Sequence, residues 1–263
     1  MAKQPTGPPP PPPVQKLRLR YTKRGRLRFT SHRDIARAFE RALRRAQVPM
    51  AYSAGFSPHP KISWVGAAPT GVASEAEYVE ISVAERVDLV RLKSALDESL
   101  PAGIDITEVV EAPAGSSLPD RIEASQWSIR LPGVPLETAR QAVAAFLSTD
   151  AVPVQRLMKA GLRELDARAA VVSMSAAGDQ DCATLSVVVR HVTPAVRPDD
   201  VLSGLRSAAD LVPPVPPEAT RYAQGPLSEP GGVGDPLAPD RLTAEGATRT
   251  VADLEQTAAG APS

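Results

Sequence analysis

Apolar and polar residues alternate where the folded part of the chain begins. Residues 17–22 read Leu-Arg-Leu-Arg-Tyr-Thr, which predicts a half-buried β-strand. Residues 26–29 alternate in the same way, and Gly25 lies between the two runs. Because a glycine between two short strands favours a tight turn, we expect a β-hairpin with arginines on one face of both strands. These arginines are Arg18, Arg20, Arg26 and Arg28.

The next segment has the periodicity of an amphipathic helix. Ser31 is suited to cap its N-terminus, Asp34 completes a capping-box pattern three residues later, and Pro49 is expected to end it. The apolar face is predicted to contain Ile35, Phe39, Leu43 and Ala46, and another face carries Arg33, Arg37, Arg41 and Arg44.

A similar succession of elements then recurs. The first half continues with expected strands at 62–65, 78–83 and 104–110 and a helix over 86–100. The second half has expected strands at 127–131, 152–157, 169–174, 185–192 and 220–223, with helices over 136–147 and 199–208. This order predicts an α+β fold of two tandem ferredoxin-like units with mostly antiparallel sheets.

Proline-rich stretches set the expected domain boundaries. Six consecutive prolines at 8–13 favour an extended polyproline II conformation that cannot join a core. We expect a disordered Pro-rich tail over 1–15, a first, basic ferredoxin-like unit over 16–112, a second unit over 113–224, and a disordered C-terminal tail over 225–263.

Charge is unevenly distributed along a chain whose net charge is zero. Residues 16–61 contain thirteen lysines and arginines against two acids, which indicates an anionic partner. The single cysteine, Cys182, excludes a disulfide within the chain and an iron–sulfur cluster held by this chain alone. We find no apolar run of about 18 residues and no apolar signal region, so we expect a cytoplasmic protein without membrane contact.

Two segments carry candidate chemistry. His32 and Arg33 lie in the first turn of the predicted helix, where free N–H groups suit an anion; alternatively, they are solvated residues beside the cap. Prolines at 58 and 60 stiffen a loop that presents Phe56, His59 and Lys61, either to bind a ligand or to pack a crossover. We expect the loop to fold back toward the helix start, so that both segments form one site.

The arginine stripe Arg33, Arg37, Arg41 and Arg44 has three interpretations. It matches the electrostatic footprint of a nucleic-acid backbone, with aromatic residues nearby for stacking on single-stranded RNA. It also suits an acidic protein face, or a merely solvated helix. The sequence has no phosphate-binding glycine loop or dinucleotide fingerprint, and its three histidines are too dispersed for a zinc motif, so we expect no cofactor and no metal site.

Several longer stretches resemble a known family. They are residues 29–34 (FTSHRD), 41–45 (RALRR), 52–63 (YSAGFSPHPKIS), 71–78 (GVASEAEY), 188–194 (VVRHVTP), 220–221 and 224–225. Over about residues 17–241 the chain resembles the radical SAM-linked proteins, which contain a domain of unknown function. The resemblance implies a radical SAM protein, encoded beside or fused to the family member, as partner. It implies no catalytic residue.

Three functions remain open at this point. The first is an accessory module that presents an anionic or RNA substrate to a radical SAM enzyme, which would itself hold the cluster that one cysteine cannot. The second is a metal-independent RNA-processing enzyme with His32 or His59 as general base. The third is a purely structural partner subunit.

Overall fold

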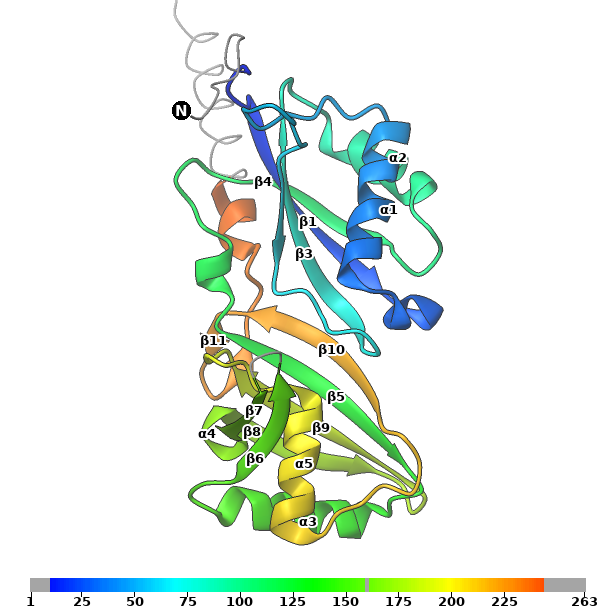
Figure 1. The fold of residues 1–263 in the computed structure, drawn as a ribbon, viewed down its shortest axis with the longest axis vertical. Helices are drawn as coiled ribbons and strands as arrows, with labels where there is room; N and C mark the ends of the chain where they lie inside the picture. Colours follow the sequence, from blue (N-terminus) through cyan, green and yellow to red (C-terminus); the bar gives the residue numbers. More distant parts are fainter. Residues whose placement is uncertain (1–9, 159–160, 244–263) are drawn as a thin grey trace, which may run out of the picture.

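The computed structural model describes residues 10–158 and 161–243. Its main sheet has the strand order β4-β1-β3-β10-β5-β9-β8, and β2 pairs with β3 beside this path (Figure 1). The first half consists of β1 (Gln15–Lys23), the 3-10 helix η1 (Gly25–Phe29), α1 (His32–Arg45), β2 (Ile62–Val65), β3 (Ala73–Val83), α2 (Leu89–Ser99) and β4 (Ile106–Glu111).

The second half follows a short 3-10 helix, η2 (Pro119–Arg121). It consists of β5 (Ala124–Pro132), α3 (Leu136–Ser148), β6 (Pro153–Met158), β7 (Gly161–Asp166), α4 (Ala167–Ala170), β8 (Val171–Gly178), β9 (Cys182–Arg190), α5 (Pro198–Ala209) and β10 (Glu218–Gly225). Two short paired strands follow, β11 (Leu227–Ser228) and β12 (Gly232–Val233).

The two halves share one pairing scheme. The first has the order β4-β1-β3-β2 and the second has β10-β5-β9-β8. Each half contributes four strands if β6 and β7 are treated as an inserted hairpin. When these four are numbered by their order in the sequence, both halves have the same order across the sheet, which is 4-1-3-2. All these pairs are antiparallel, whereas the junction between β10 and β3 is parallel. The predicted α+β fold with a mostly antiparallel sheet is therefore confirmed.

One expected strand belongs to the inserted hairpin and not to the main sheet. The segment expected as a strand at 152–157 forms β6, but it pairs only with β7, in a separate two-stranded sheet. The segment expected at 169–174 begins in α4 and enters β8 only at Val171. Periodicity identified the extended segment but did not show which strand would be its partner.

Helix α1 forms as its periodicity predicts. Ser31 Oγ accepts a hydrogen bond from Asp34 N at 3.3 Å and donates to Asp34 Oδ2 at 2.7 Å, so the cap is in place. Ile35, Phe39 and Leu43 are buried, while Ala46 is only partly covered. The Phe39 ring packs edge-on against Tyr21 and Trp64, with centroids 4.8 and 5.1 Å away. These contacts form the centre of the first hydrophobic core.

The predicted hairpin at the start of the chain is wrong. Strand β1 pairs with β3 on one side and with β4 on the other, so neither edge is open to a following strand. Residues 25–29 instead turn away as η1, with Gly25 at a positive φ of 56°. Arg26 and Arg28 therefore do not continue the face of β1.

The arginine face of β1 is not a solvent-facing surface. Arg18 has no exposed area, and its guanidinium donates to Glu80 Oε1 at 2.9 Å and to both Asp240 carboxylate oxygens at 2.8 Å. Arg20 donates to the carbonyl oxygen of Glu75 at 3.2 Å. Asp240 also accepts from Arg121 at 2.9 Å. Apolar and charged residues do alternate along β1, but the charged face is covered, and Arg18 is paired there with buried carboxylates.

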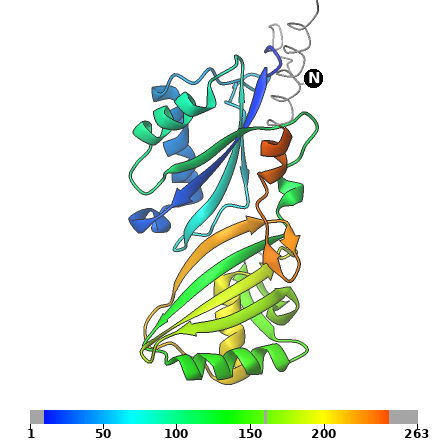
Figure 2. The ribbon, with the colours of Figure 1, turned by 180° about the vertical axis from the view of Figure 1, so that it is seen from behind.

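The segment that covers this face was expected to be disordered. Residues 225–243 contain β11, β12 and a helical stretch at 238–243. Leu237 lies just before this helical stretch and Asp240 lies within it, and both are buried. Figure 2 shows this orange-red segment on the opposite side of the first half's sheet from α1 and α2. The expectation is thus wrong for 225–243, and the expected disorder over 1–9 and 244–263 lies outside the described residues. At the other end, β1 begins at Gln15.

No helix in the described part of the chain is long and apolar enough to cross a membrane.

Candidate functional site

The solvent-facing side of α1 concentrates positive charge. Its fourteen residues include five arginines, all exposed, against Asp34 and Glu40. Arg37 Nη1 lies 3.7 Å from Asp34 Oδ1. Among the residues that the structure describes, Arg33, Arg41 and Arg44 have no carboxylate within ion-pair distance. The last turn carries Arg44 and Arg45, which complement the negative end of the helix dipole.

The loop between α1 and β2 has a rigid stem and an exposed tip. Tyr52 and Pro60 form an isolated antiparallel bridge. Within it, Ser53 N donates to the His59 carbonyl oxygen at 2.9 Å, and His59 N donates to Ser53 Oγ at 3.0 Å. Gly55 turns the chain at a φ of 127°, and Phe56 beside it is 67% exposed. The stem therefore fixes where the side chains of the loop lie.

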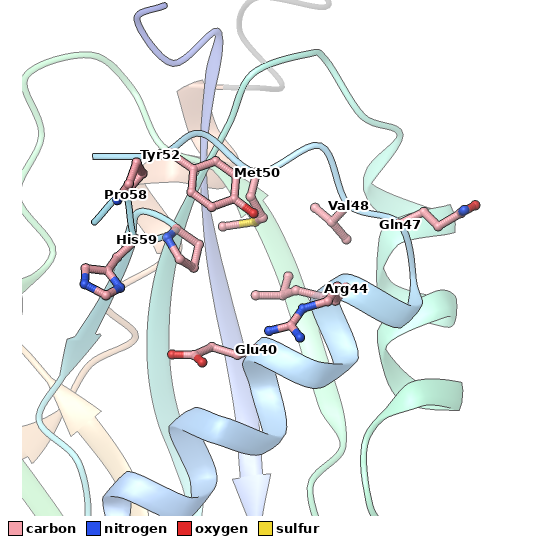
Figure 3. Close-up of a pocket in the computed structure, with 10 residues that line it drawn as sticks. Glu40, Arg44, Gln47, Val48, Met50, Tyr52, Pro58 and His59 are labelled. Atoms are coloured by element: carbon pink, nitrogen blue, oxygen red, sulfur yellow. The ribbon is translucent and has the colours of Figure 1, made fainter. Parts of the chain in front are cut away.

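A cavity of about 500 Å³ separates this loop from the second half of α1. Figure 3 shows Glu40 and Arg44 extending from the helix toward the loop, with Tyr52, Pro58 and His59 across the gap. The lining also includes Leu43, Gln47, Val48, Met50 and Pro60. The cavity thus has a partly apolar wall and a rim with acidic, basic and imidazole groups.

Only two of the predicted site residues meet in this cavity, Arg44 and His59. Arg33, Arg37, Arg41 and Phe56 are exposed but do not line it. Lys61 is held by its backbone, since Lys61 N donates to the Ala51 carbonyl oxygen and its own carbonyl oxygen accepts from Ser82 N. The loop folds back on the second half of α1 and not on the helix start, where it was expected.

The helix start takes no part in this cavity. The His32 ring packs edge-on against Trp64, with centroids 5.2 Å apart, and neither His32 nor Arg33 lines the cavity. His32 and Glu40 are eight residues apart, which is about 12 Å along a helix. The loop faces the second half of α1 because β2 leads away from it toward Trp64 and the helix start. Glu40 was missed because its position carries no sequence signal beyond helix phase, and Gln47 and Met50 because they follow α1 in a segment without periodicity.

In residues 10–158 and 161–243, no group of three or more His, Cys, Asp or Glu side chains is arranged to hold a metal ion.

A second group of titratable residues lies where the two halves meet. Tyr21 is buried beside Glu77 and Arg221, and burial together with the Glu77 carboxylate raises its pKa well above the ordinary value. Burial lowers the pKa of Lys23, partly offset by Glu77. Arg221 forms an ion pair with Glu77, and both are almost fully buried. Sequence periodicity gave no sign of this group.

Comparison with known proteins gives a family but no activity. Residues 16–198 match the model of the family described as "Uncharacterized protein conserved in bacteria (DUF2344)". No curated protein matches. Among solved structures, an unknown protein from Galdieria sulphuraria is similar over 80% of this chain and 99% of its own, with 14% identity and a TM-score of 0.24. The encapsulated DyP-type peroxidase from Mycobacterium smegmatis is similar over 87% and 100%, with 11% identity and a TM-score of 0.19. The family model covers more than half of the chain, and the chain therefore belongs to this family of uncharacterized bacterial proteins.

Proposed function

We propose that this protein is an accessory binding module that holds a single-stranded RNA or a similar polyanion on α1 and the adjoining loop, for a radical SAM enzyme. The observation that carries the proposal is the set of exposed arginines on α1, four of which have no carboxylate partner among the described residues; one of these, Arg45, donates instead to the Ser99 carbonyl oxygen. Arginines left without internal partners are free to bind phosphates, and each phosphate contact releases counterions.

The loop adds a contact of another kind. Tyr52 is 46% exposed and Phe56 is 67% exposed, on a stem held by its own hydrogen bonds. Exposed aromatic rings beside a basic groove are the usual platform for unpaired bases. In the proposed complex, the phosphates follow the arginines of α1 and one base stacks on Phe56. Arg44 of α1 and His59 of the loop both line the cavity between helix and loop.

The radical SAM partner rests on the resemblance of residues 29–34, 41–45 and 52–63. In this proposal the partner supplies the cluster chemistry, and this chain supplies the substrate surface. Affinity capture of the tagged chain from its own cells, with and without nuclease, tests the partner. Recovery of a radical SAM protein in both arms supports direct contact, and recovery only without nuclease would make RNA the bridge. Absence from both arms contradicts this part of the proposal.

Fluorescence anisotropy with a labelled single-stranded RNA tests the binding surface. The variant Arg37→Gln/Arg41→Gln/Arg44→Gln removes three charges from α1. The matched control, Arg140→Gln/Arg163→Gln/Arg190→Gln, removes three exposed charges from the second half. We expect the α1 variant to weaken binding and to reduce the salt slope by about 0.7 for each phosphate that is no longer neutralised. The control should bind like the unmodified chain.

Phe56→Ala separates stacking from charge. It should weaken binding by about 1–3 kcal/mol for one stacked base, with the salt slope unchanged. Equal weakening in both triple variants, or no binding at the lowest salt, would contradict the proposal. In the same samples, shortening of the RNA that depends on His32 or His59 would favour the alternative of an RNA-processing enzyme.

A further inference from the structure

A second cavity, of about 320 Å³, lies at the seam between the two halves. The first half contributes the loop after β2, and the second contributes β5, β9, β10 and the approach to α5. Strand β10 makes this seam, because it pairs with β5 along its length and with β3 at Thr220 and Arg221. Figure 1 shows β10 between the two halves. Interfaces of this kind are frequent sites for small ligands, and the volume is at the low end for them.

The wall contributed by the second half is largely apolar. It includes the buried side chains of Trp127, Val189 and Val196. The Arg221 guanidinium carbon lies 5.4 Å from the centroid of the Trp127 ring. A flat apolar group in the cavity therefore has an aromatic surface to pack against, next to a cation.

A serine and a histidine are paired in the same lining. Ser125 Oγ and His191 Nε2 are 2.7 Å apart. Burial and the positive charge of Arg221 lower the pKa of His191, which favours the neutral imidazole. The pair supplies polar atoms to the cavity without adding a charge of its own.

The buried charges beside the cavity do not balance. Lys23 and Arg221 are each 3% exposed, and Glu77, which pairs with Arg221, is 2% exposed. Lys23 Nζ donates to the carbonyl oxygen of Pro69, a residue of the lining, at 3.2 Å. Two buried cations thus share one carboxylate, and a buried excess of positive charge favours an anion nearby.

The N-terminus of α5 also favours an anion in this cavity. Pro198, the first residue of this twelve-residue helix, lines the cavity, so the positive end of the helix dipole lies at its wall. Asp200, in the first turn, is already engaged by Arg156 at 2.5 Å and by Arg197 N at 2.7 Å. Its charge is therefore matched by Arg156 and does not offset the excess at the seam.

Three of the sequence stretches that carried the resemblance converge here. Residues 71–78 supply Glu77, residues 188–194 supply Val189 and His191, and residues 220–221 supply Arg221. The α1 surface uses none of these stretches. These three stretches therefore meet around one cavity, and this cavity is separate from the proposed RNA surface.

We propose that the seam cavity is a binding site for a small organic monoanion, a carboxylate attached to a flat apolar group. The carboxylate lies toward Arg221 and the start of α5, the flat group packs on Trp127, and the Ser125–His191 pair hydrogen-bonds the ligand. The site is independent of polyanion binding on α1.

Tryptophan fluorescence tests this site directly. The chain has two tryptophans, so in the Trp64→Phe variant Trp127 is the only reporter. Benzoate is the probe, and benzamide is its neutral counterpart of nearly the same shape. We expect a saturable change in Trp127 fluorescence with benzoate in the low-millimolar range. Benzamide should bind about tenfold more weakly, since it cannot form a charge-assisted hydrogen bond. A thermal shift with benzoate in the unmodified chain provides the second measurement.

Two variants locate the ligand. Ala195 is exposed and lines the cavity, so Ala195→Phe should block it, whereas Ala54→Phe in the α1–β2 loop should not change binding. Lys23→Met removes the excess charge and should weaken benzoate, but not benzamide, by about tenfold. The proposal is overturned by no saturable change, by equal affinity for benzoate and benzamide, or by unchanged benzoate binding in the folded Ala195→Phe or Lys23→Met variants.

Discussion

The two halves share a strand order but differ in what covers the second face of each sheet. In the second half much of this face is polar and in contact with solvent: Arg130 is exposed beside the fully buried Ile129, although Val188 on the same face as Arg130 is buried. In the first half both faces are buried. Leu17 and Leu19 pack under the helices, and Arg18 between them is enclosed with Glu80 and Asp240.

This difference shows that alternation along a strand does not reveal what its polar face contacts. A strand of alternating apolar and charged residues is compatible with a sheet that faces water on one side. It is equally compatible with a sheet whose charged side is neutralised by a later segment of the chain. In this protein the two solutions occur in adjacent halves of one continuous sheet.

The largest expected effect comes from breaking the buried ion network. Asp240→Ala leaves Arg18 enclosed with one carboxylate fewer, and loss of one partner of a buried pair costs about 3–5 kcal/mol of the free energy of unfolding. Glu218→Ala is the control, because Glu218 lies 3.5 Å from Arg130 in an exposed pair. Such a pair contributes about 0–1 kcal/mol. Urea unfolding measures both, and similar destabilisation would mean that the two faces are equally solvated.

The two hydrophobic cores should respond alike. Phe39 in the first and Phe146 in the second have no exposed area, and truncation of a buried phenylalanine to alanine costs about 3–5 kcal/mol. Thermal melting of Phe39→Ala and Phe146→Ala compares them. A melting temperature unchanged by Phe39→Ala would show that the apolar face of α1 has been wrongly assigned.

A smaller destabilisation is expected at the seam. Gly66 has a φ of 57°, and a Cβ there would lie 2.3 Å from Gln224 Oε1. Gly25 has almost the same φ, 56°, with no atom within 4 Å of an added Cβ. Both alanine variants should be destabilised by about 1–2 kcal/mol from backbone strain. Gly66→Ala should be destabilised by about 1–3 kcal/mol more from overpacking. Equal effects in urea unfolding would mean that Gln224 moves aside freely.

The smallest effect concerns pH. Burial and Arg221 lower the pKa of His191 in the folded state, so the unfolded chain binds this proton more readily. The contribution of His191 to stability is therefore complete above the ordinary histidine pKa of about 6.5 and is lost as the pH falls below it. Unfolding free energies at about pH 7.5 and about pH 5.5 should differ less in His191→Gln than in the unmodified chain. An unchanged difference would place the pH dependence elsewhere.

Local patterns predicted local structure well. Ser31, Asp34 and the spacing of Ile35, Phe39 and Leu43 define α1 within a single segment, so periodicity and capping were sufficient. The partner of Arg18 was beyond such reasoning, because Asp240 is 222 residues away in the sequence. The same limit applies to the candidate site. Arg44 and His59 could be named as candidates, but their grouping without His32 depends on the direction in which β2 leaves the loop.

The long separation between Arg18 and Asp240 also bears on how the protein is made. During synthesis the first half emerges from the ribosome well before residue 240, so the charged face of β1 stays open to water until residue 240 has emerged as well. Contacts so distant in sequence slow folding, because a large loop must close before they form. The nascent first half therefore keeps an open charged face until residue 240 has been synthesised.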